Sequence, residues 1–211
     1  MSRRRQKRNQ SLWDQPGLFD LPSEGESDGR VLRPMDDSKL ERPDRMRFMS
    51  FGSGSSGNCS YIGTPECGLL IDAGIDNKYV TQQLAANGID IKTIRGILLT
   101  HDHSDHVRYA YQIARHNKHI HIYCTPRVLN GIFRRHSISR RLKEVHVSIF
   151  KEIPFTLAGM QFTAFEVSHD GTDNAGFFVE YGSQRFAIAT DLGCITDRAK
   201  FYMTQADYLM I

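Results

Sequence analysis

The chain has 211 residues, 40% of them hydrophobic, which is enough for one ordinary domain with a buried core. No run approaches the roughly 20 apolar residues of a membrane-spanning helix, and no apolar segment follows the basic N-terminus, so we expect neither a membrane protein nor a secretory signal. The four cysteines lack Cys-x-x-Cys spacing, which predicts reduced thiols in a cytoplasmic protein.

Charge is unevenly distributed along the chain, although the formal net charge is only +3. Residues 107–151 contain ten basic side chains and one acidic one, a local charge of +9, whereas the remainder carries 17 basic and 23 acidic residues. Such asymmetry indicates a polyanionic partner.

Residues 1–46 are predicted to form a disordered tail. They combine ten basic and nine acidic residues without a sustained apolar period, so they bury too little apolar surface to offset the entropy lost on ordering. One apolar island, residues 12–21, contains the only Trp and predicts a short docking peptide. The alternative is an apolar strip that folds back onto the domain.

The pattern changes at residue 47 and predicts a folded domain over residues 47–211. Short apolar, β-branched runs bounded by Gly, Asp, Asn or Pro indicate strands. The predicted strands cover residues 47–51, 60–63, 68–71, 94–99, 119–124, 145–150, 160–167, 175–181 and 185–189.

Three helices fit between these strands. The first covers residues 77–86 with Asp76 as its N-cap, and the second covers residues 105–116. The third begins after Thr125, with Pro126 at its first helical position. Strands followed by strand–helix alternation and then further strands indicate an α/β layered domain.

The segment 101–106, His-Asp-His-Ser-Asp-His, directly follows an apolar strand. His101 and His103 are two residues apart and can point the same way from an extended strand end. Asp105 and His106 open the next helix and turn toward a second site, so one loop supplies ligands for two metal ions. The alternative is a polar, solvated loop.

Three further strand ends carry residues of the same kind. His169 follows the strand 160–167 and adds an imidazole, whereas Asp191 follows the strand 185–189 and adds a carboxylate that can bridge two ions. Asp72 follows the strand 68–71 and is better placed to orient a ligand by a hydrogen bond.

In chain order, Asp72, the segment His101-x-His103-x-Asp105-His106, His169 and Asp191 resemble the first four motifs of the metallo-β-lactamase superfamily. The resemblance implies an αβ/βα sandwich with a binuclear centre of Zn²⁺ or Mn²⁺ at one edge, and hydrolysis as its chemistry. Asp105, His106 and Asp191 are then also catalytic residues. The implied ligands are His101, His103 and His169 for one ion, Asp105 and His106 for the other, and Asp191 as a bridge.

A narrower resemblance comes from the glycine-rich residues 51–58, Phe-Gly-Ser-Gly-Ser-Ser-Gly-Asn, together with Ser168-His169-Asp170. These segments are similar to the YycJ/WalJ group of metallo-β-lactamase-fold proteins, which are regarded as DNA exonucleases connected with mismatch repair. Alone, the glycine-rich segment predicts only a tight hairpin.

The resemblance also implies a further motif that the chain lacks. The superfamily's last motif is a His beyond the bridging Asp, and no His follows His169. The second half of the sandwich is therefore expected to be incomplete in this chain, as a fragment or a truncated product, which leaves its activity open.

Basic residues supply an independent indication of nucleic acid as substrate. Clustered cations neutralise phosphates and bind without sequence preference. The alternative is an ordinary solvated basic helix and loop. The predicted DNA-binding residues are Arg127, Arg134, Arg135, Arg140, Arg141 and Lys143.

The apolar island offers a second partner. Gln15, Leu18 and Phe19 match the short Gln-x-x-Leu-Phe peptides by which bacterial repair proteins dock on the sliding clamp.

The leading hypothesis is thus a metal-dependent DNA exonuclease of the cytoplasm. The alternatives are an RNA, ester or thioester hydrolase of the same superfamily, and a catalytically weak adaptor that binds DNA or the sliding clamp.

Overall fold

The computed structural model describes residues 45–211. The docking peptide predicted at residues 12–21, with Gln15, Leu18 and Phe19, lies outside the described residues, as does nearly all of the predicted tail. No helix within residues 45–211 is long and apolar enough to cross a membrane.

The first half of the fold is a six-stranded mixed sheet in chain order. The first three strands are antiparallel neighbours, and the remaining pairs are parallel. Because both faces of β3 are covered, its sequence is a continuous apolar run, as expected for a buried parallel strand. The strands are β1 Arg47–Gly52, β2 Cys59–Gly63, β3 Gly68–Ile71, β4 Ile94–Leu98, β5 His121–Cys124 and β6 His146–Ser148.

The second half is a five-stranded sheet with the order β11-β10-β9-β8-β7. Its strands are antiparallel except for the parallel pair of β10 and β11. The predicted strands are confirmed, with ends within about two residues. The strands are β7 Phe155–Leu157, β8 Met160–Glu166, β9 Ala175–Tyr181, β10 Gln184–Ile188 and β11 Tyr208–Met210.

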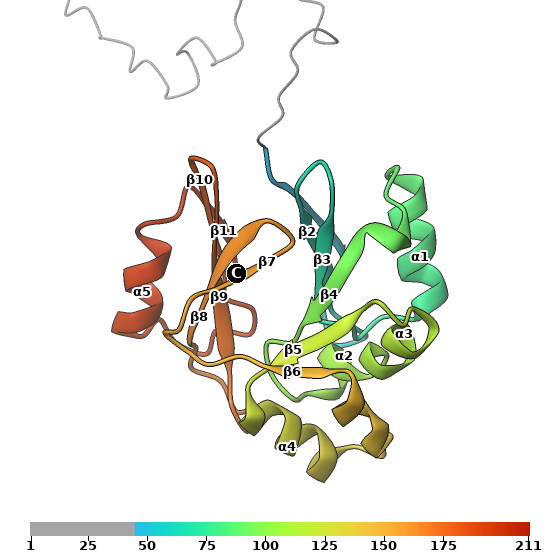
Figure 1. Cartoon of the computed structure of the whole chain (residues 1–211). Helices are drawn as coiled ribbons and strands as arrows, with labels where there is room; N and C mark the ends of the chain where they lie inside the picture. Colours follow the sequence, from blue (N-terminus) through green and yellow to red (C-terminus); the bar gives the residue numbers. More distant parts are fainter. Residues whose placement is uncertain (1–44) are drawn as a thin grey trace, which may run out of the picture. The chain divides into compact units, whose positions relative to one another are not determined.

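Helices cover the outer side of each sheet, giving the helix–sheet–sheet–helix order that the family resemblance implies (Figure 1). α5 packs on the second sheet, and the other helices belong to the first half (Figure 1). The helices are α1 Asn77–Ala86, α2 Ser104–Val107, α3 Ala110–His116, α4 Pro126–Arg135 and α5 Asp197–Met203, with 3₁₀ turns η2 Ile91–Thr93 and η3 Arg140–Glu144.

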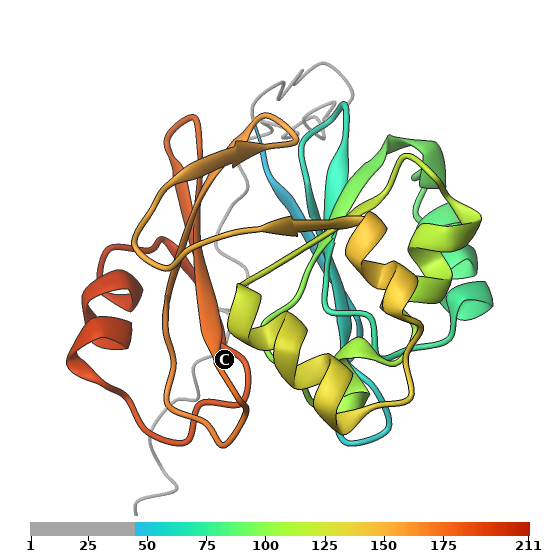
Figure 2. The ribbon, with the colours of Figure 1, turned by 60° about the horizontal axis from the view of Figure 1, so that its bottom comes forward.

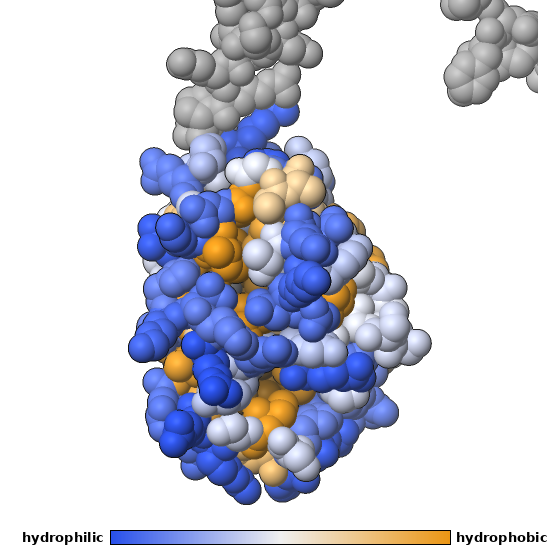
Figure 3. Space-filling view, turned by 90° about the vertical axis from the view of Figure 1, so that its right-hand side faces the viewer, coloured by the Kyte–Doolittle hydropathy of each residue, from blue (hydrophilic) through white to orange (hydrophobic). Residues whose placement is uncertain are grey.

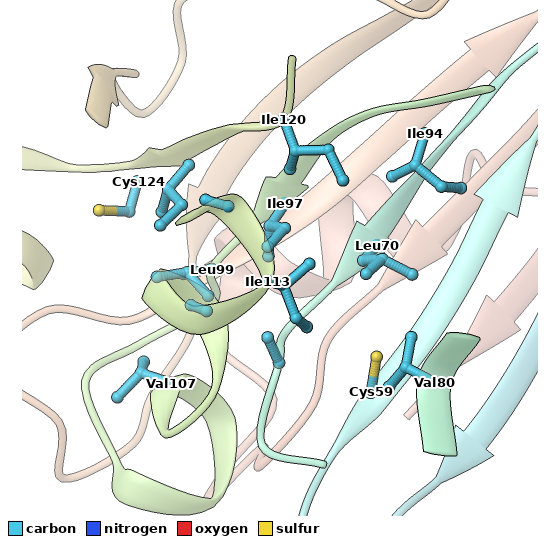
Figure 4. Close-up of a cluster of buried hydrophobic side chains, with 14 of the residues drawn as sticks. Cys59, Leu70, Val80, Ile94, Ile97, Leu99, Val107, Ile113, Ile120 and Cys124 are labelled. Atoms are coloured by element: carbon cyan, nitrogen blue, oxygen red, sulfur yellow. The ribbon is translucent and has the colours of Figure 1, made fainter. Parts of the chain in front are cut away.

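Two main apolar layers hold the sandwich together. Between the sheets, Leu69 and Ile71 of β3 belong to one buried cluster with Phe162 and Phe177 of the second sheet. Between the first sheet and its helices lies a second cluster, drawn in part in Figure 4, which includes Cys59, Leu70, Val80, Ile94, Ile97, Leu99, Val107, Ile113, Ile120 and Cys124. The outer face of this helical side is mainly hydrophilic, with small separate apolar patches (Figure 3).

The predicted helix starts at Asp76 and Thr125 are confirmed. The Asp76 carboxylate accepts from the backbone N–H of Lys78 at 2.9 Å, and Thr125 Oγ1 accepts from that of Val128 at 3.2 Å. Both side chains satisfy backbone donors that the first helical turn leaves free.

The single helix predicted over residues 105–116 is wrong, because it is broken between α2 and α3. The carbonyl of Asp105 accepts from the N–H of Asn58 at 2.7 Å, and the carbonyl of His106 accepts from that of Ala73 at 2.6 Å. The N–H of Tyr109 donates to the Ala73 carbonyl at 2.8 Å. Contacts with distant segments thus replace the bonds that a continuous helix needs.

Candidate metal centre

Four strand ends bring polar side chains to one edge of the sandwich. β3 and β4 are parallel neighbours, and they end shortly before Asp72 and His101. β8 and β10 both pair antiparallel with β9 and so run the same way, ending shortly before His169 and Asp191. The φ angles of Asp72 and Asp191 are +60° and +53°, a left-handed conformation that Asp tolerates better than most residues.

Four imidazoles lie in contact at this edge. The ring centroid of His101 lies 4.6 Å from that of His103 and 4.1 Å from that of His106. The His169 centroid lies 4.8 Å from both His101 and His103. Two sets of ligand atoms result, each within 4.8 Å: His101, His103 and His169, and His101, His106 and Asp191.

The environment of His101 shows whether these side chains suit a metal ion. Its ring is buried, and its Nε2 has no hydrogen-bond partner within residues 45–211. Burial lowers the pKa of His101 to about 3, against the opposing effect of the Asp72 carboxylate. A neutral imidazole with a free nitrogen is the form that binds metal, and histidine nitrogens with carboxylate oxygens suit divalent transition metals. The side chains therefore fit the predicted ions.

Asp72 orients His106, as the sequence predicts. Asp72 Oδ2 lies 2.8 Å from His106 Nδ1, which turns Nε2 of the same ring toward the other ligands. Asp72 Oδ1 accepts from the backbone N–H of Thr100 at 2.9 Å. Burial lowers the pKa of His106, but the neighbouring carboxylates, with Asp72 foremost, outweigh it and raise the pKa. Such a contact fixes the tautomer and the orientation of a metal-binding imidazole.

Two carboxylates complete the cluster. Asp191 Oδ2 lies 2.7 Å from His106 Nε2 and 3.8 Å from His101 Nε2, so one carboxylate reaches both sets of ligand atoms. Asp105 Oδ2 lies 3.6 Å from His106 Nε2. All six side chains predicted as ligands are therefore brought together, and their metal-binding and catalytic roles stay predictions.

The comparison with known families agrees with this geometry. Residues 68–211 match the model of the beta-lactamase superfamily domain. The chain belongs to the beta-lactamase superfamily. The resemblance that the sequence motifs suggested is thereby confirmed.

Two bacterial relatives within this superfamily carry nuclease names. The chain is 29% identical over 155 residues to "Exodeoxyribonuclease YycJ" of Bacillus anthracis, covering 74% of this chain and 58% of the relative. It is 26% identical over 166 residues to "Exodeoxyribonuclease WalJ" of Streptococcus pneumoniae serotype 2, covering 78% of this chain and 61% of the relative. The chain thus spans about three fifths of the length of these curated relatives.

Solved structures of the superfamily confirm the fold. Zn²⁺-bound PqqB from Methylobacterium extorquens superposes with a TM-score of 0.63 at 19% identity, covering 78% of this chain and 71% of that one. The metallo-beta-lactamase fold protein YhfI from Bacillus subtilis gives a TM-score of 0.61 at 16% identity, covering 79% and 70%. A metallo-β-lactamase fold implies divalent metal ions, in keeping with the donor set found here.

Asn58 is a part of the centre to which the sequence reasoning assigned no role. Its Nδ2 lies 3.0 Å from Asp105 Oδ2 and 2.9 Å from His106 Nε2. Its Oδ1 accepts from the backbone N–H of Gly54 at 2.9 Å, which closes the glycine-rich loop. The motif at residues 51–58 was the available signal, but only the fold reveals that its last residue reaches the ligands.

Asp102 is a second residue to which the sequence analysis assigned no role, although it stands between two predicted ligands. Its carboxylate is fully buried and accepts from the N–H of Thr172 at 2.9 Å, in the loop that follows His169. It also lies 3.2 Å from Nε of Arg135 on α4. A Cβ on Gly131 would lie only 2.0 Å from Asp102 Oδ2, so this close approach requires a glycine there.

Asp170 adds an exposed carboxylate at the mouth of the centre. Its Oδ1 lies 3.4 Å from His103 Nε2 and 3.3 Å from His169 Nε2. The sequence analysis quoted this residue only as a part of a motif.

The six predicted DNA-binding residues all lie on α4 and η3, and all are exposed. Arg135 forms the ion pair with Asp102, whereas the other five form none with residues 45–211. Arg127 donates to the carbonyl of Thr172 at 3.3 Å, so α4 contacts the loop that carries His169. Arg140 and Lys143 lie over the ring of Phe133. Figure 2 brings this side of the molecule forward and shows α4 in front.

Proposed function

We propose that this chain is the metal-binding part of a DNA exonuclease, a hydrolase that cleaves phosphodiester bonds at DNA ends. The observation that carries the proposal is the pair of ligand sets at one edge of the sandwich, with Asp191 in reach of both. The names of the two bacterial relatives support DNA as the substrate.

The ligand side chains can be assigned to two ions. Because His101 Nδ1 lies 3.0 Å from Thr100 Oγ1, only Nε2 of His101 is free to bind, and it belongs with His103 and His169. His106, with Asp105 and Asp191, would hold the second ion. When bound, two divalent ions such as Zn²⁺ or Mn²⁺ supply Lewis acidity that activates water and stabilises charge on phosphate oxygens.

The protein's contribution is to hold these ligands in place. Asp72 fixes the ring of His106, and Asn58 holds the carboxylate of Asp105. On the other side of the centre, Asn174 Nδ2 donates to the His169 carbonyl at 2.9 Å. Ligands that are already oriented lose little entropy on binding an ion or a phosphate.

The basic surface, defined as the exposed cations of α4 and η3, supports nucleic acid over a small ester as substrate. Arg127 and Arg135 tie α4 to the loop after His169 and to Asp102, so the surface adjoins the ligands. Apart from Arg135, these cations form no ion pair with residues 45–211, so they are free to neutralise phosphates, which gives binding that weakens as salt rises. A hydrolase of small esters has no need of such a surface.

Degradation of end-labelled DNA tests the proposal. We expect loss of label with Mn²⁺ or Zn²⁺, no loss in chelator, and no loss with His103→Ala. Bis(p-nitrophenyl) phosphate serves as a second substrate that needs only the metal centre. Hydrolysis of this small diester without any degradation of DNA would overturn the proposed nuclease and favour the ester or RNA hydrolase.

We also propose that the tail docks on the sliding clamp and that the protein is cytoplasmic. The peptide motif at Gln15, Leu18 and Phe19 supports the first, and the four free cysteines support the second. A peptide of residues 10–22 should bind the clamp, and the change Leu18→Ala should abolish this binding. Equal binding of both peptides, or of neither, would contradict clamp docking.

A further inference from the structure

A pocket of about 540 Å³ lies beside the metal centre, and none of the predicted metal ligands lines it. Its walls come from the glycine-rich loop, from the start of α1 and from the break between α2 and α3. The side chains that give it its chemistry are Ser53, Ser56, Tyr79, Arg108 and Tyr109.

The pocket is joined to the metal centre through two backbone segments. On one wall, Gly57 precedes Asn58, whose backbone and side chain both bind Asp105. On the other wall, Arg108 and Tyr109 lie two and three residues after His106 along the chain. The residues that shape the pocket are therefore held by the same contacts that position the ligands of the second ion.

The side chains of the pocket match the parts of a nucleotide. Tyr79 is 44% exposed and Tyr109 is half-buried, so aromatic surface is available for a base to stack on. Arg108 is exposed and forms no ion pair with residues 45–211, which leaves its guanidinium free for a phosphate. Asp76, the acidic residue of the lining, is engaged as the N-cap of α1.

Glycines keep the pocket open and its wall fixed. Gly57 has a φ of +155°, and a Cβ there would lie 2.6 Å from the carbonyl oxygen of Gly74. The loop is closed by the N–H of Gly57, which donates to the carbonyl of Gly54 at 3.0 Å. A rigid backbone wall without side chains allows a ligand to approach closely.

We propose that this pocket holds the terminal nucleotide of the DNA strand, with its base against Tyr79 and Tyr109 and a phosphate at Arg108. The inference rests on the proposed function, because it places the strand end beside the metal centre. The basic surface contacts the loop after His169 through Arg127, and it contacts Asp102 through Arg135, so it would hold the strand beyond the cleaved bond. A volume of about 540 Å³ suits a single nucleotide.

Photocrosslinking tests the pocket without requiring cleavage. Single-stranded 12-mers with 5-iododeoxyuridine at the 5′ or the 3′ end are irradiated with the full chain in chelator, and the crosslinked peptide is identified by mass spectrometry. We expect one of the two ends to crosslink to Tyr79 or Tyr109. Because stacking on an aromatic ring contributes about 1–3 kcal/mol per base, Tyr79→Ala should reduce the yield about 5- to 150-fold.

Matched variants separate stacking from structure. Tyr79→Phe should retain the crosslink to Tyr109 because it keeps the ring. Tyr208→Ala should change nothing, since Tyr208 is similarly exposed, at 52%, but lies on β11 outside the pocket. Arg108→Ala should weaken binding of deoxythymidine monophosphate, whereas Arg95→Ala should not. Crosslinks found only outside the pocket, or no crosslink at all, would overturn the proposal.

The two proposals fail in different ways. If the chain degrades DNA and Tyr79→Ala leaves both crosslinking and degradation unchanged, the pocket proposal fails and the nuclease stands. If the crosslink maps to the pocket but DNA is never degraded with metal, the pocket stands as a nucleotide site and the exonuclease fails.

Discussion

The two sheets make unequal contributions to the metal centre. His101 and His106, from the first sheet, have side chains that are 2% and 1% exposed. His169 and Asp191, from the second sheet, are 23% and 40% exposed. His101 and His106 are thus buried among the strands and loops that position them, whereas His103 and Asp105 of the same loop are 25% and 26% exposed. The second-sheet ligands are also partly exposed.

The supporting contacts differ in the same way. Behind His106, the carboxylate of Asp72 and the hydroxyl of Thr100 form a buried network. His169 is held through the backbone of its loop, by Asn174, by the contact of Asp102 with Thr172 and by the N–H of Gly193, which donates to the Ser168 carbonyl at 2.7 Å. Folding of the first sheet therefore fixes His101 and His106, whereas His169 depends on a few contacts of its loop.

The largest effect is expected from Asp72→Asn. Asn also tolerates the φ of +60°, so the backbone is kept while the charge that holds His106 is lost. Loss of such a supporting carboxylate weakens metal binding about 10- to 100-fold. Calorimetric titration with Zn²⁺ against a competing chelator measures the change. An affinity equal to that of the wild type would show that the buried network does not orient the ligand.

The next largest effect is expected from Asp102→Ala. It leaves the partly buried N–H of Thr172 without its carboxylate partner and releases the loop of His169, which costs about 1–3 kcal/mol of folding stability. We expect a lower Tm in chelator and weaker binding of Co²⁺ to the three-histidine site, seen in the visible spectrum. Gly131→Ala should reproduce both effects, because its Cβ would displace the same carboxylate. If Gly131→Ala behaves as the wild type, this contact is not what holds the loop.

A smaller effect is expected from Asn58→Ala. The variant removes one partly buried hydrogen bond to the carboxylate of Asp105, worth about 1 kcal/mol, or roughly a fivefold change in affinity for the second ion. Binding of the first ion should be unchanged. A loss of both ions together, measured as metal content after dialysis, would show instead that the glycine-rich loop supports the whole centre.

The smallest effect is expected at single cations of the basic surface. Arg134→Ala and Arg140→Ala should each weaken DNA binding at all sequences and reduce the slope of log affinity against log salt by about one. Arg95→Ala is the control, since Arg95 is exposed at the start of β4, outside the basic surface. Fluorescence anisotropy at several salt concentrations measures the slopes, and equal slopes in all three variants would contradict a DNA-binding role.

Much of the fold is predictable because local signals agree with it. The apolar runs gave the strands, and Asp76 and Thr125 marked two helix starts that the structure confirms. The short helix α5 was not predicted, although Thr196 caps it through a 3.1 Å bond to the N–H of Ala199. A seven-residue helix shows too little periodicity to stand out from a loop.

The residues of the centre that directly follow strands could be predicted from the sequence. The residues whose role depends on a contact with a segment far away along the chain could not. Three histidines, His101, His103 and His106, closely follow one apolar strand, and this spacing alone predicts metal ligands. The role of Asn58 depends on a contact 47 positions away along the chain, and that of Asp102 on one 70 positions away. No local pattern encodes such pairings. The break at Tyr109 has the same origin, because Ala73 takes its hydrogen bond.

The central claim is that the two ligand sets hold two divalent ions, and metal content tests it most directly. The account predicts two zinc ions per chain after loading and dialysis, one in His103→Ala and one in His106→Ala. The ion retained in each variant should be the one whose ligands are intact, as read from anomalous diffraction at the zinc edge. A single ion in the wild type, or zinc bound away from both ligand sets, would contradict the account.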